Sequence, residues 1–414
     1  MSRRKRRNLL RAISSCIAVG VAGCQDDDSS TTEERTQEAT RSPSDSPTPD
    51  TETPTETETP TETETPQEYE TSGEPPSSTL RVADINFDNG SVGSGVVGAV
   101  SGDGKTVVCS GTADGDAVAF AVTTGLDIRW TARFPNWQGG DDNPGGVDVA
   151  TTADSAYLLA AQSADDPETL GVLRLSSRGE LVSVNEIDAG EFLWPQRAWV
   201  EPLSDGTYLL AWTESGPNDK RTFLRRYDAD GSLRWEQVYR EFTLHRVVTG
   251  HRVACVLMGT RLRRGFRTVG VRADGATAWT HETGSYDFIG STHVPDGYLL
   301  WGPRTEDGKT VGNVAAKLSP DGSRAWRRTY EAPDTAVGAG VGTGDGYRLF
   351  VPEREGFGRI TLEADGQLGG ATSYNVRPQR GMEVSTATRV GDATVVAGVT
   401  TEGWPYDDGW IASI

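Results

Sequence analysis

The sequence repeats one pattern seven times between Val96 and Thr400: an apolar strand, a tight turn and a second strand centred on a triplet like Tyr-Leu-Leu. The clearest copies are Ser204–Thr213, Pro295–Pro303 and Gly344–Pro352, and the weaker ones are Gly102–Thr112, Ala153–Gln162, Gly250–Thr260 and Val390–Thr400. A repeat at this spacing constrains the architecture before any single residue is interpreted, because each copy cannot bury its apolar faces alone.

A second hairpin follows each of the first six copies, and its turn contains a glycine: Gly125, Gly179, Gly231, Gly275, Gly322 and Gly366. Four of these turns are followed by a tryptophan: Trp130, Trp235, Trp279 and Trp326. Glycine supplies the positive backbone φ that two-residue hairpin turns require. Each unit therefore reads as four short strands, and we expect its tryptophan to pack between neighbouring units.

The predicted fold is all-β, a seven-bladed β-propeller of four-stranded antiparallel blades. The turn glycines are 44 to 54 residues apart, which is the length of a four-stranded propeller blade. The last unit ends at Trp410–Ile414, which matches a third strand. We expect the N-terminal strand Thr79–Phe87 to supply the missing fourth strand, so that the last blade is complete and no edge is left unpaired.

The N-terminus has the features of an export signal. Arg6 and Arg7 resemble the twin-arginine motif, and an apolar run from Ile13 to Gly23 is too short to span a membrane. The run ends in Val21-Ala22-Gly23-Cys24, which resembles a lipoprotein lipobox. We predict a signal peptide over residues 1–23 and a lipid on Cys24; the alternative is an ordinary signal peptide with an incidental cysteine.

Residues 24–78 are rich in Thr, Glu and Pro, which bury too little apolar surface to fold. We predict a disordered acidic stalk there and the propeller over residues 79–414. The chain carries a net charge of −20, which argues against nucleic acid as a partner. The acidic balance and the excess of Arg over Lys favour a secreted halophilic archaeal protein; a GC-rich bacterium is the alternative. We expect a monomer on the cell surface, outside the cytoplasm and anchored to the membrane through Cys24.

The sequence offers no recognised catalytic or metal-binding motif, and we predict neither a catalytic residue nor a metal site. Aligning the repeats places Cys109 and Cys255 in one core position, which Ala160, Ala211, Trp301, Phe350 and Ala397 occupy in other units. We therefore interpret both cysteines as core residues. Their units lie far apart in a sevenfold ring, so a disulfide between them is not expected.

The segments AVTTGLDIRW, RYDADGSLRW and KLSPDGSRAW resemble the repeats of quinoprotein-like (PQQ-like repeat) β-propellers, and more closely those of secreted prokaryotic propeller proteins. The resemblance covers about 79–414 and implies the propeller fold. Quinone-dependent dehydrogenases in that wider family have eight blades, a vicinal cysteine pair and calcium-binding carboxylates. Because this chain has seven apparent units and no Cys-Cys pair, we expect no cofactor, neither quinone nor calcium.

The connections between second and third strands, and between successive units, vary in length and gather on one face of the predicted ring. Variable loops on a rigid scaffold are where binding usually occurs. The candidate binding face combines aromatic and acidic residues: Trp137, Asp141, Asp142, Trp194, Trp404, Tyr406, Asp407 and Asp408. The interpretation that competes with a binding face is that the acids are solvating charges and the aromatic residues anchor loops.

Our first hypothesis is a membrane-anchored binding or scaffold module for a protein or glycan partner, without catalysis. The alternatives are a redox or glycan-active enzyme with its site in the central funnel, or an envelope assembly factor. Two or more carboxylates near the axis would favour the enzyme. A funnel lined only by the Val, Ala and Gly of the first strands (GVVGAV, VDVATT, AVGAGV) would favour binding.

Overall fold

The computed structural model describes residues within the unit Glu62–Ile414. They are residues 81–85, 96–101, 104–113, 115–138, 148–152, 154, 156–166, 168–189, 195–215, 220–250, 253–260, 265–282, 288–306, 309–330, 335–353, 356–375, 382–400 and 409–414. Regular structure in these ranges consists entirely of β-strands, which confirms the predicted all-β class.

The strands form antiparallel sheets of four, of which two are joined edge to edge. The joined pair contains β2 (Val96–Ser101), β3 (Thr106–Ala113), β4 (Asp116–Thr123), β5 (Ile128–Gln138), β6 (Asp148–Thr151), β7 (Tyr157–Ser163), β8 (Thr169–Leu175) and β9 (Leu181–Asp188). The next two sheets contain β10 (Pro195–Pro202), β11 (Tyr208–Ser215), β12 (Lys220–Tyr227) and β13 (Leu233–Arg240), then β14 (Thr243–Gly250), β15 (Val253–Thr260), β16 (Gly265–Arg272) and β17 (Thr277–Glu282).

The remaining strands form three further sheets. They are β18 (Gly290–Val294), β19 (Gly297–Glu306), β20 (Lys309–Leu318) and β21 (Arg324–Tyr330), then β22 (Ala339–Gly342), β23 (Gly346–Glu353), β24 (Gly356–Glu363) and β25 (Leu368–Asn375), and finally β26 (Met382–Val390), β27 (Ala393–Thr400) and β28 (Gly409–Ser413) with β1 (Arg81–Ile85). Residues 304–306 pair with residues 309–312, which lengthens the β19–β20 hairpin.

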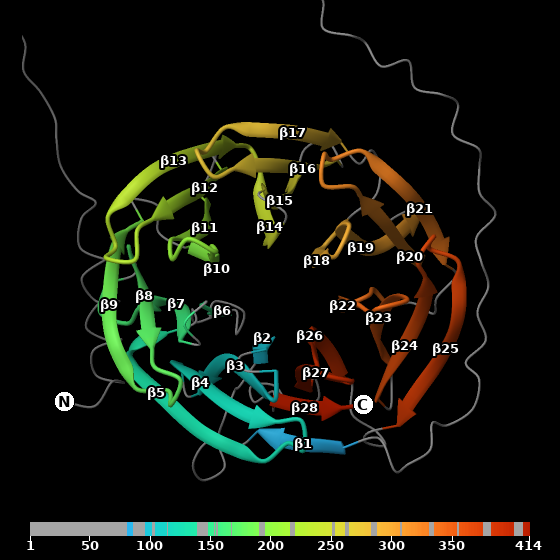
Figure 1. Cartoon of the computed structure of the whole chain (residues 1–414), viewed down its shortest axis with the longest axis horizontal. Helices are drawn as coiled ribbons and strands as arrows, with labels where there is room; N and C mark the ends of the chain where they lie inside the picture. Colours follow the sequence, from blue (N-terminus) through green and yellow to red (C-terminus); the bar gives the residue numbers. More distant parts are fainter. Residues whose placement is uncertain are drawn as a thin grey trace, which may run out of the picture. The chain divides into compact units, whose positions relative to one another are not determined.

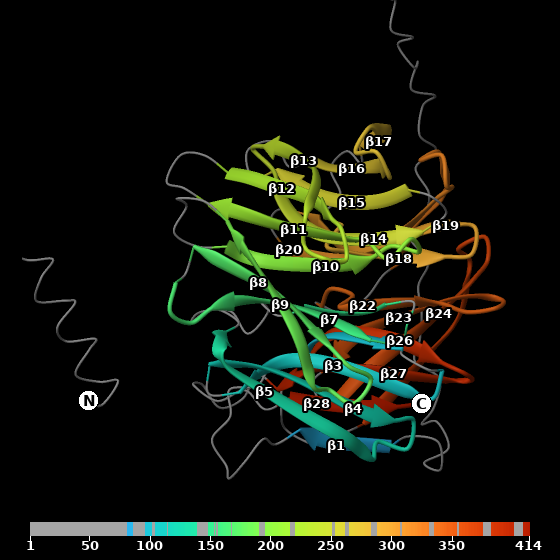
Figure 2. The ribbon, with the colours of Figure 1, turned by 60° about the vertical axis from the view of Figure 1, so that its left-hand side comes forward.

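The first strand of each sheet lies innermost in the ring of sheets (Figure 1). These inner strands contact one another in the cyclic order β2, β6, β10, β14, β18, β22, β26 and back to β2. β1 comes from the other end of the chain and lies beside β28 in both ribbon views (Figure 1 and Figure 2), with Arg81 opposite Ser413 and Ile85 opposite Gly409.

The apolar core lies between successive sheets. One cluster joins Leu158 and Val172 of one sheet to Leu210 and Trp212 of the next, and comparable clusters fill the other spaces between neighbouring sheets. In each sheet the middle strands alternate, so that one row of side chains meets the preceding sheet and the other row meets the following one. The inner strands are therefore held at fixed positions around the centre.

The outer hairpin turns differ from the predicted two-residue type. In the turn 228–232 the Gly231 N–H donates to the Asp228 carbonyl and the Asp228 N–H to the Ser232 carbonyl, which closes a three-residue loop with a bulge. Gly231 takes the positive φ that this loop needs. In the first sheet Leu126, with φ 67°, occupies that position, so the prediction for Gly125 was wrong by one residue.

The four predicted tryptophans pack between sheets, as expected. Each indole N–H donates to a carbonyl in the next sheet's outer turn; the acceptors of Trp130, Trp235, Trp279 and Trp326 are the carbonyls of Ser177, Ala273, Pro320 and Ala364. Each ring also covers the glycine of that turn, and a Cβ on Gly322 would lie 2.3 Å from the Trp279 ring. The repeated Gly and Trp therefore form one structural contact between sheets.

A matched pair of glycine variants tests this contact. Gly322→Ala adds a methyl group at φ +84° against the Trp279 ring, whereas Gly206→Ala adds one at φ +82° where nothing lies within 4 Å. Gly206→Ala should cost about 1 kcal/mol for the left-handed backbone, and Gly322→Ala about 2–4 kcal/mol because overpacking is added. Urea denaturation measures both, and equal losses would contradict the packing role of Trp279.

Candidate functional site

Among the residues predicted for the binding face, Trp137 lies in the described part of the chain. It is 8 % exposed and belongs to the core between the first two sheets. Its ring covers Gly171, where a Cβ would lie 2.2 Å away. Trp137 is therefore packed in the core instead of displayed. The other predicted positions lie outside the described residues: Asp141, Asp142, Trp194, Trp404, Tyr406, Asp407 and Asp408, as well as Arg6, Arg7 and Cys24.

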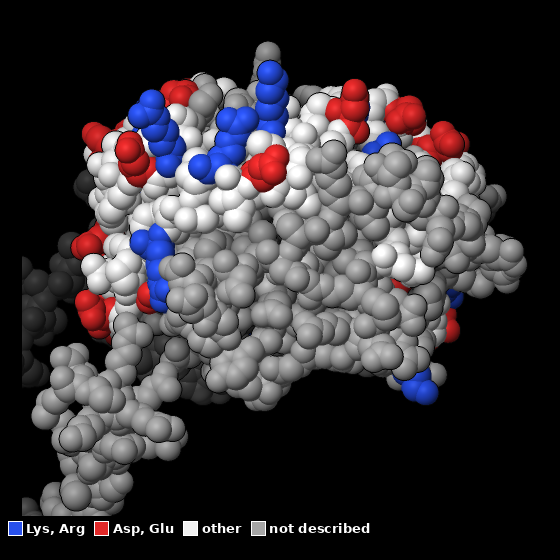
Figure 3. All heavy atoms as spheres, turned by 90° about the horizontal axis from the view of Figure 1, so that it is seen from below, with Lys and Arg blue, Asp and Glu red and all other residues white. Residues whose placement is uncertain are grey.

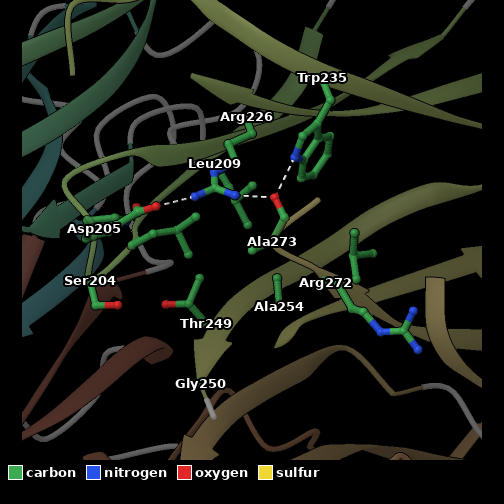
Figure 4. Close-up of a pocket in the computed structure, with 13 residues that line it drawn as sticks. Ser204, Asp205, Leu209, Arg226, Trp235, Thr249, Gly250, Ala254, Arg272 and Ala273 are labelled. Atoms are coloured by element: carbon green, nitrogen blue, oxygen red, sulfur yellow. Dashed lines mark hydrogen bonds and ion pairs between the residues drawn. The ribbon is translucent and has the colours of Figure 1, made fainter. Parts of the chain in front are cut away.

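A cleft of about 310 Å³ lies between the β10–β13 and β14–β17 sheets (Figure 4). Its centre is Arg226, which binds the Asp205 carboxylate at 2.5 Å, the Thr207 hydroxyl at 3.0 Å and the Ala273 carbonyl. Trp235 donates to the same carbonyl at 2.8 Å. The Arg226 guanidinium and the Trp235 indole N–H already have partners within the protein. We therefore interpret these residues as a structural contact between the two sheets.

The ion pair in this cleft has counterparts elsewhere. Arg174 with Asp154, and Lys317 with Asp296, link the third strand to the turn between the first and second strands in two other sheets. Basic and acidic side chains lie close together on the described surface of Figure 3 as well. A feature that recurs in several sheets serves the scaffold, so a functional site is better sought where the repeat is broken.

A second cavity, of about 270 Å³, is lined mainly by residues that lie in five of the inner strands or directly before them. We call it the axial cavity. Its lining residues are Trp199, His245, Arg246, Ile289, Gly290, Ser291, Thr292, Trp301, Gly338, Ala339, Gly340, Glu383, Val384, Ser385, Thr386 and Ala387. These strands surround the central opening of the ring (Figure 1). The cavity is therefore built by the sheets together and by no single repeat.

Strand register places three unusual residues at one level around this opening. Asp148, Trp199 and Arg246 lie opposite Ala160, Ala211 and Leu257 in three consecutive sheets. The equivalent residues in the described part of the other sheets are small: Gly98, Gly290, Ala339 and Thr386. The repeat is thus interrupted at this level by a carboxylate, an indole and a guanidinium.

The same register corrects the alignment of the cysteines. Val107 and Ala254 each pair with the last residue before an outer turn, as Tyr208 does. Counting from them, the positions equivalent to Ala211 are Ser110 and Leu257 instead of Cys109 and Cys255. A shift of one residue exchanges the two faces of a strand. Cys109 remains a core residue, fully buried, and its burial raises the pKa of the thiol.

Trp301 enters the cavity wall because two glycines admit its ring. It lies opposite Gly290 across the β18–β19 pair, and a Cβ on Gly290 would approach the indole to 2.4 Å. A Cβ on Gly340, on the inner strand of the next sheet, would approach the same ring to 2.9 Å. The indole therefore spans two inner strands at the edge of the cavity.

Three buried donors in the cavity wall have no hydrogen-bond partner within the described part of the chain. They are Nε of Arg246, the hydroxyl of Ser291 and Nε1 of Trp301. Ser291 is 1 % exposed and Trp301 is 4 % exposed, so their polar atoms are largely removed from bulk water. A buried polar group without a partner is costly, and its presence requires an explanation such as water or a ligand. Here three such groups line the same cavity.

Next to the cavity lies an acidic pair. Glu201 of β10 accepts a hydrogen bond from the Thr249 hydroxyl at 3.3 Å, and Asp148 accepts one from the Val200 N–H at 3.0 Å. Burial, together with the nearby Asp148 charge, raises the pKa of Glu201 to about 8, although Arg246 opposes this shift. Arg246 itself lies over the Trp199 ring, with its guanidinium carbon 4.4 Å from the ring centre.

The inner strands therefore carry more chemistry than their small residues predicted. The cavity wall includes Arg246, Ser291 and Glu383 besides alanine and glycine, and the pair Asp148 and Glu201 meets our criterion for the enzyme hypothesis. This site was not predicted from the sequence. Two signals could have indicated it: Trp301 stands in a position that alanine occupies in three other sheets, and a charged residue lies in the first strand of the fourth unit.

Within the described ranges, no group of three or more His, Cys, Asp or Glu side chains could hold a metal ion. The same ranges contain no helix with the length and apolar character needed to cross a membrane.

No known family model matches this chain, and no curated protein matches it either. Among solved structures, the chain resembles the polysaccharide lyase Uly1 with a TM-score of 0.52 and 11% identity, over 80% of this chain and 92% of that one. A prolyl endopeptidase (TM-score 0.48, 13% identity) and the acylaminoacyl peptidase of Pyrococcus horikoshii (TM-score 0.47, 9% identity) also match. The prolyl endopeptidase match covers 78% of this chain and 50% of that one, and the peptidase match covers 75% and 51%. At these identities the likeness shows the fold alone, which is β-propeller-like.

Proposed function

We propose that this chain is a membrane-anchored binding module outside the cytoplasm, and that its ligand site is the axial cavity. The observation that carries the proposal is the set of three buried donors, on Arg246, Ser291 and Trp301, that have no partner in the described protein and line one cavity. Donors of this kind are satisfied by a ligand rich in acceptor oxygens, such as a sugar or an organic acid.

In this proposal the scaffold is a seven-bladed propeller closed by its N-terminal strand. The cyclic contacts of the inner strands and the pairing of β1 with β28 support it. A closed ring keeps the inner strands at fixed spacing, which positions donors from two neighbouring blades around one cavity. Residues 1–23 are the signal peptide, the lipid on Cys24 is the anchor and residues 24–78 are the stalk. The variable-loop face remains available to a protein or glycan partner.

Thermal denaturation of the mature protein with added glucose, glucuronate, acetate or sulfate tests the cavity as a ligand site. At least one of these probes should raise the Tm, because a ligand that binds only the folded state stabilises it. Trp301→Phe should abolish that gain, since it removes the indole N–H and keeps an aromatic ring between Gly290 and Gly340. An unchanged Tm with all four probes, or the same gain in the variant, would overturn the cavity as a ligand site.

A second candidate, an enzyme acting on glycans, is favoured by Glu201. A carboxyl with a pKa near 8 holds its proton at neutral pH and can act as a general acid. Release of 4-nitrophenol from 4-nitrophenyl glycosides measures this activity. The enzyme hypothesis predicts turnover that Glu201→Gln abolishes. The absence of turnover, or an equal rate in the variant, would exclude Glu201 as the acid for these substrates.

A further inference from the structure

The side chain of Arg246 is held so that its donors remain available. Its guanidinium carbon lies 4.4 Å above the centre of the Trp199 ring, and stacking on an indole holds a guanidinium flat. A guanidinium in this position keeps its N–H groups in the plane of the group, along its edge. Nε is one of the buried atoms without a partner in the described protein. The fork of Nε and one Nη matches the two oxygens of a carboxylate.

The groups around Arg246 determine how much of its positive charge a ligand meets. Glu201 lies near enough to Arg246 for the two charges to interact, and Asp148 and Thr249 also face Glu201 from the neighbouring inner strands. Because burial raises the pKa of Glu201 to about 8, this carboxyl is mostly neutral at pH 7. Asp148 accepts its hydrogen bond from Val200, on the sheet that carries Trp199.

Two other titratable residues line the axial cavity, His245 and Glu383. The His245 ring packs on Phe266, with ring centres 5.0 Å apart. Glu383 is exposed, so water and salt screen its charge. At neutral pH the Arg246 guanidinium, the Ser291 hydroxyl and the Trp301 indole N–H are donors in the cavity wall, and together they favour an anion.

We propose that the axial cavity selects a small hydroxylated carboxylic acid, whose carboxylate pairs with Arg246 while Ser291 and Trp301 donate to its oxygens, and that Glu201 makes this binding depend on pH. The inference rests on the proposed ligand site and names its ligand class. Above pH 8 an ionised Glu201 would neutralise Arg246 and compete with the ligand carboxylate. A cavity of about 270 Å³ limits the ligand to a molecule near the size of one sugar.

Isothermal titration of the mature protein with glucuronate, glucose, acetate and sulfate tests this proposal. At pH 6.5 glucuronate should bind at least tenfold more tightly than glucose, because the two share a ring and differ in the carboxylate. Sulfate shows whether any anion binds, and acetate shows how much the carboxylate alone contributes. Both should bind more weakly than glucuronate. Raising the pH to 9.5 should weaken glucuronate binding at least fivefold.

Three variants make the test specific. Arg246→Gln should weaken glucuronate binding at least tenfold. Arg267→Gln is the matched control and should change nothing, since Arg267 also stacks on an aromatic ring and has an unpaired Nε but lies outside the cavity wall. Glu201→Gln should remove the dependence of glucuronate affinity on pH between pH 6.5 and pH 9.5.

The outcomes separate the two proposals. Equal binding of glucose and glucuronate, lost in Trp301→Phe, would overturn the selection of an acid and leave the cavity as the ligand site. Sulfate binding as tightly as glucuronate would overturn the carboxylate in favour of any anion. A pH dependence that persists in Glu201→Gln would overturn the role of Glu201. Absence of binding by every probe would overturn both proposals.

Discussion

Deletion of residues 79–87 from the protein without its predicted signal peptide is expected to lower the Tm by roughly 10 °C or more, because several kcal/mol are lost with the pairing of β1. Five residues of β1 pair with β28 in register. Without them β28 becomes an edge strand whose N–H and C=O groups face water. Differential scanning calorimetry measures the change.

The matched control is a deletion of nine residues from the predicted stalk, residues 50–58. It shortens the chain by the same length and should leave the Tm unchanged. If the two deletions have the same small effect, closure of the ring by the N-terminal strand is wrong, and the proposed rigid spacing of the inner strands loses its physical basis.

The second large effect concerns Glu201 and pH. The pKa of this carboxyl is about 8 in the folded protein and 4.5 ordinarily, so the folded state holds more protons than the unfolded state between these values. The free energy of unfolding therefore falls as the pH rises from about 4.5 through about 8. Glutamine cannot ionise and keeps a carbonyl that can accept from Thr249. We expect Glu201→Gln to gain stability over the wild type as the pH rises, by a few kcal/mol at pH 9.

Urea denaturation at pH 5 and pH 9 measures this difference between wild type and variant. Glu186→Gln removes a charge from an exposed position and serves as the control, which should follow the wild type at both values. If the free energies of unfolding of the wild type and Glu201→Gln differ by the same amount at pH 5 and at pH 9, the folded-state pKa of Glu201 is ordinary. That result would also remove the basis for pH-dependent ligand binding.

The fold was largely predictable because it depends on local patterns that recur. The turn glycines, the triplet strands and the tryptophan after the turn each appear in several units, so a weak signal in one copy is supported by the others. The errors occurred where a copy deviates. Leu126, and not Gly125, takes the left-handed turn position. The predicted alignment placed Cys109 and Cys255 one residue out of register, in two sheets whose second strand does not begin with a tyrosine.

The axial cavity could not be predicted in the same way. Asp148, Trp199 and Arg246 are about 50 residues apart in sequence, and they share a level only because their sheets follow one another around the opening. Their equivalence depends on knowing the strand register to a single residue. A bulge precedes Arg246, so the pattern of apolar residues does not determine the register of that strand. The predicted loop face, by contrast, drew on the length and composition of the loops, and Trp137 from that set is a core residue.

The most direct test of the account is the indole N–H signal of Trp301 in a ¹H–¹⁵N spectrum of the mature protein, assigned with the Trp301→Phe variant. Trp326 is the internal reference, because its N–H already donates to the Ala364 carbonyl at 3.0 Å. Saturating glucuronate at pH 6.5 should shift the Trp301 signal downfield, as its buried donor gains an acceptor, and leave the Trp326 signal in place. A Trp301 signal that does not move would contradict the axial cavity as the ligand site.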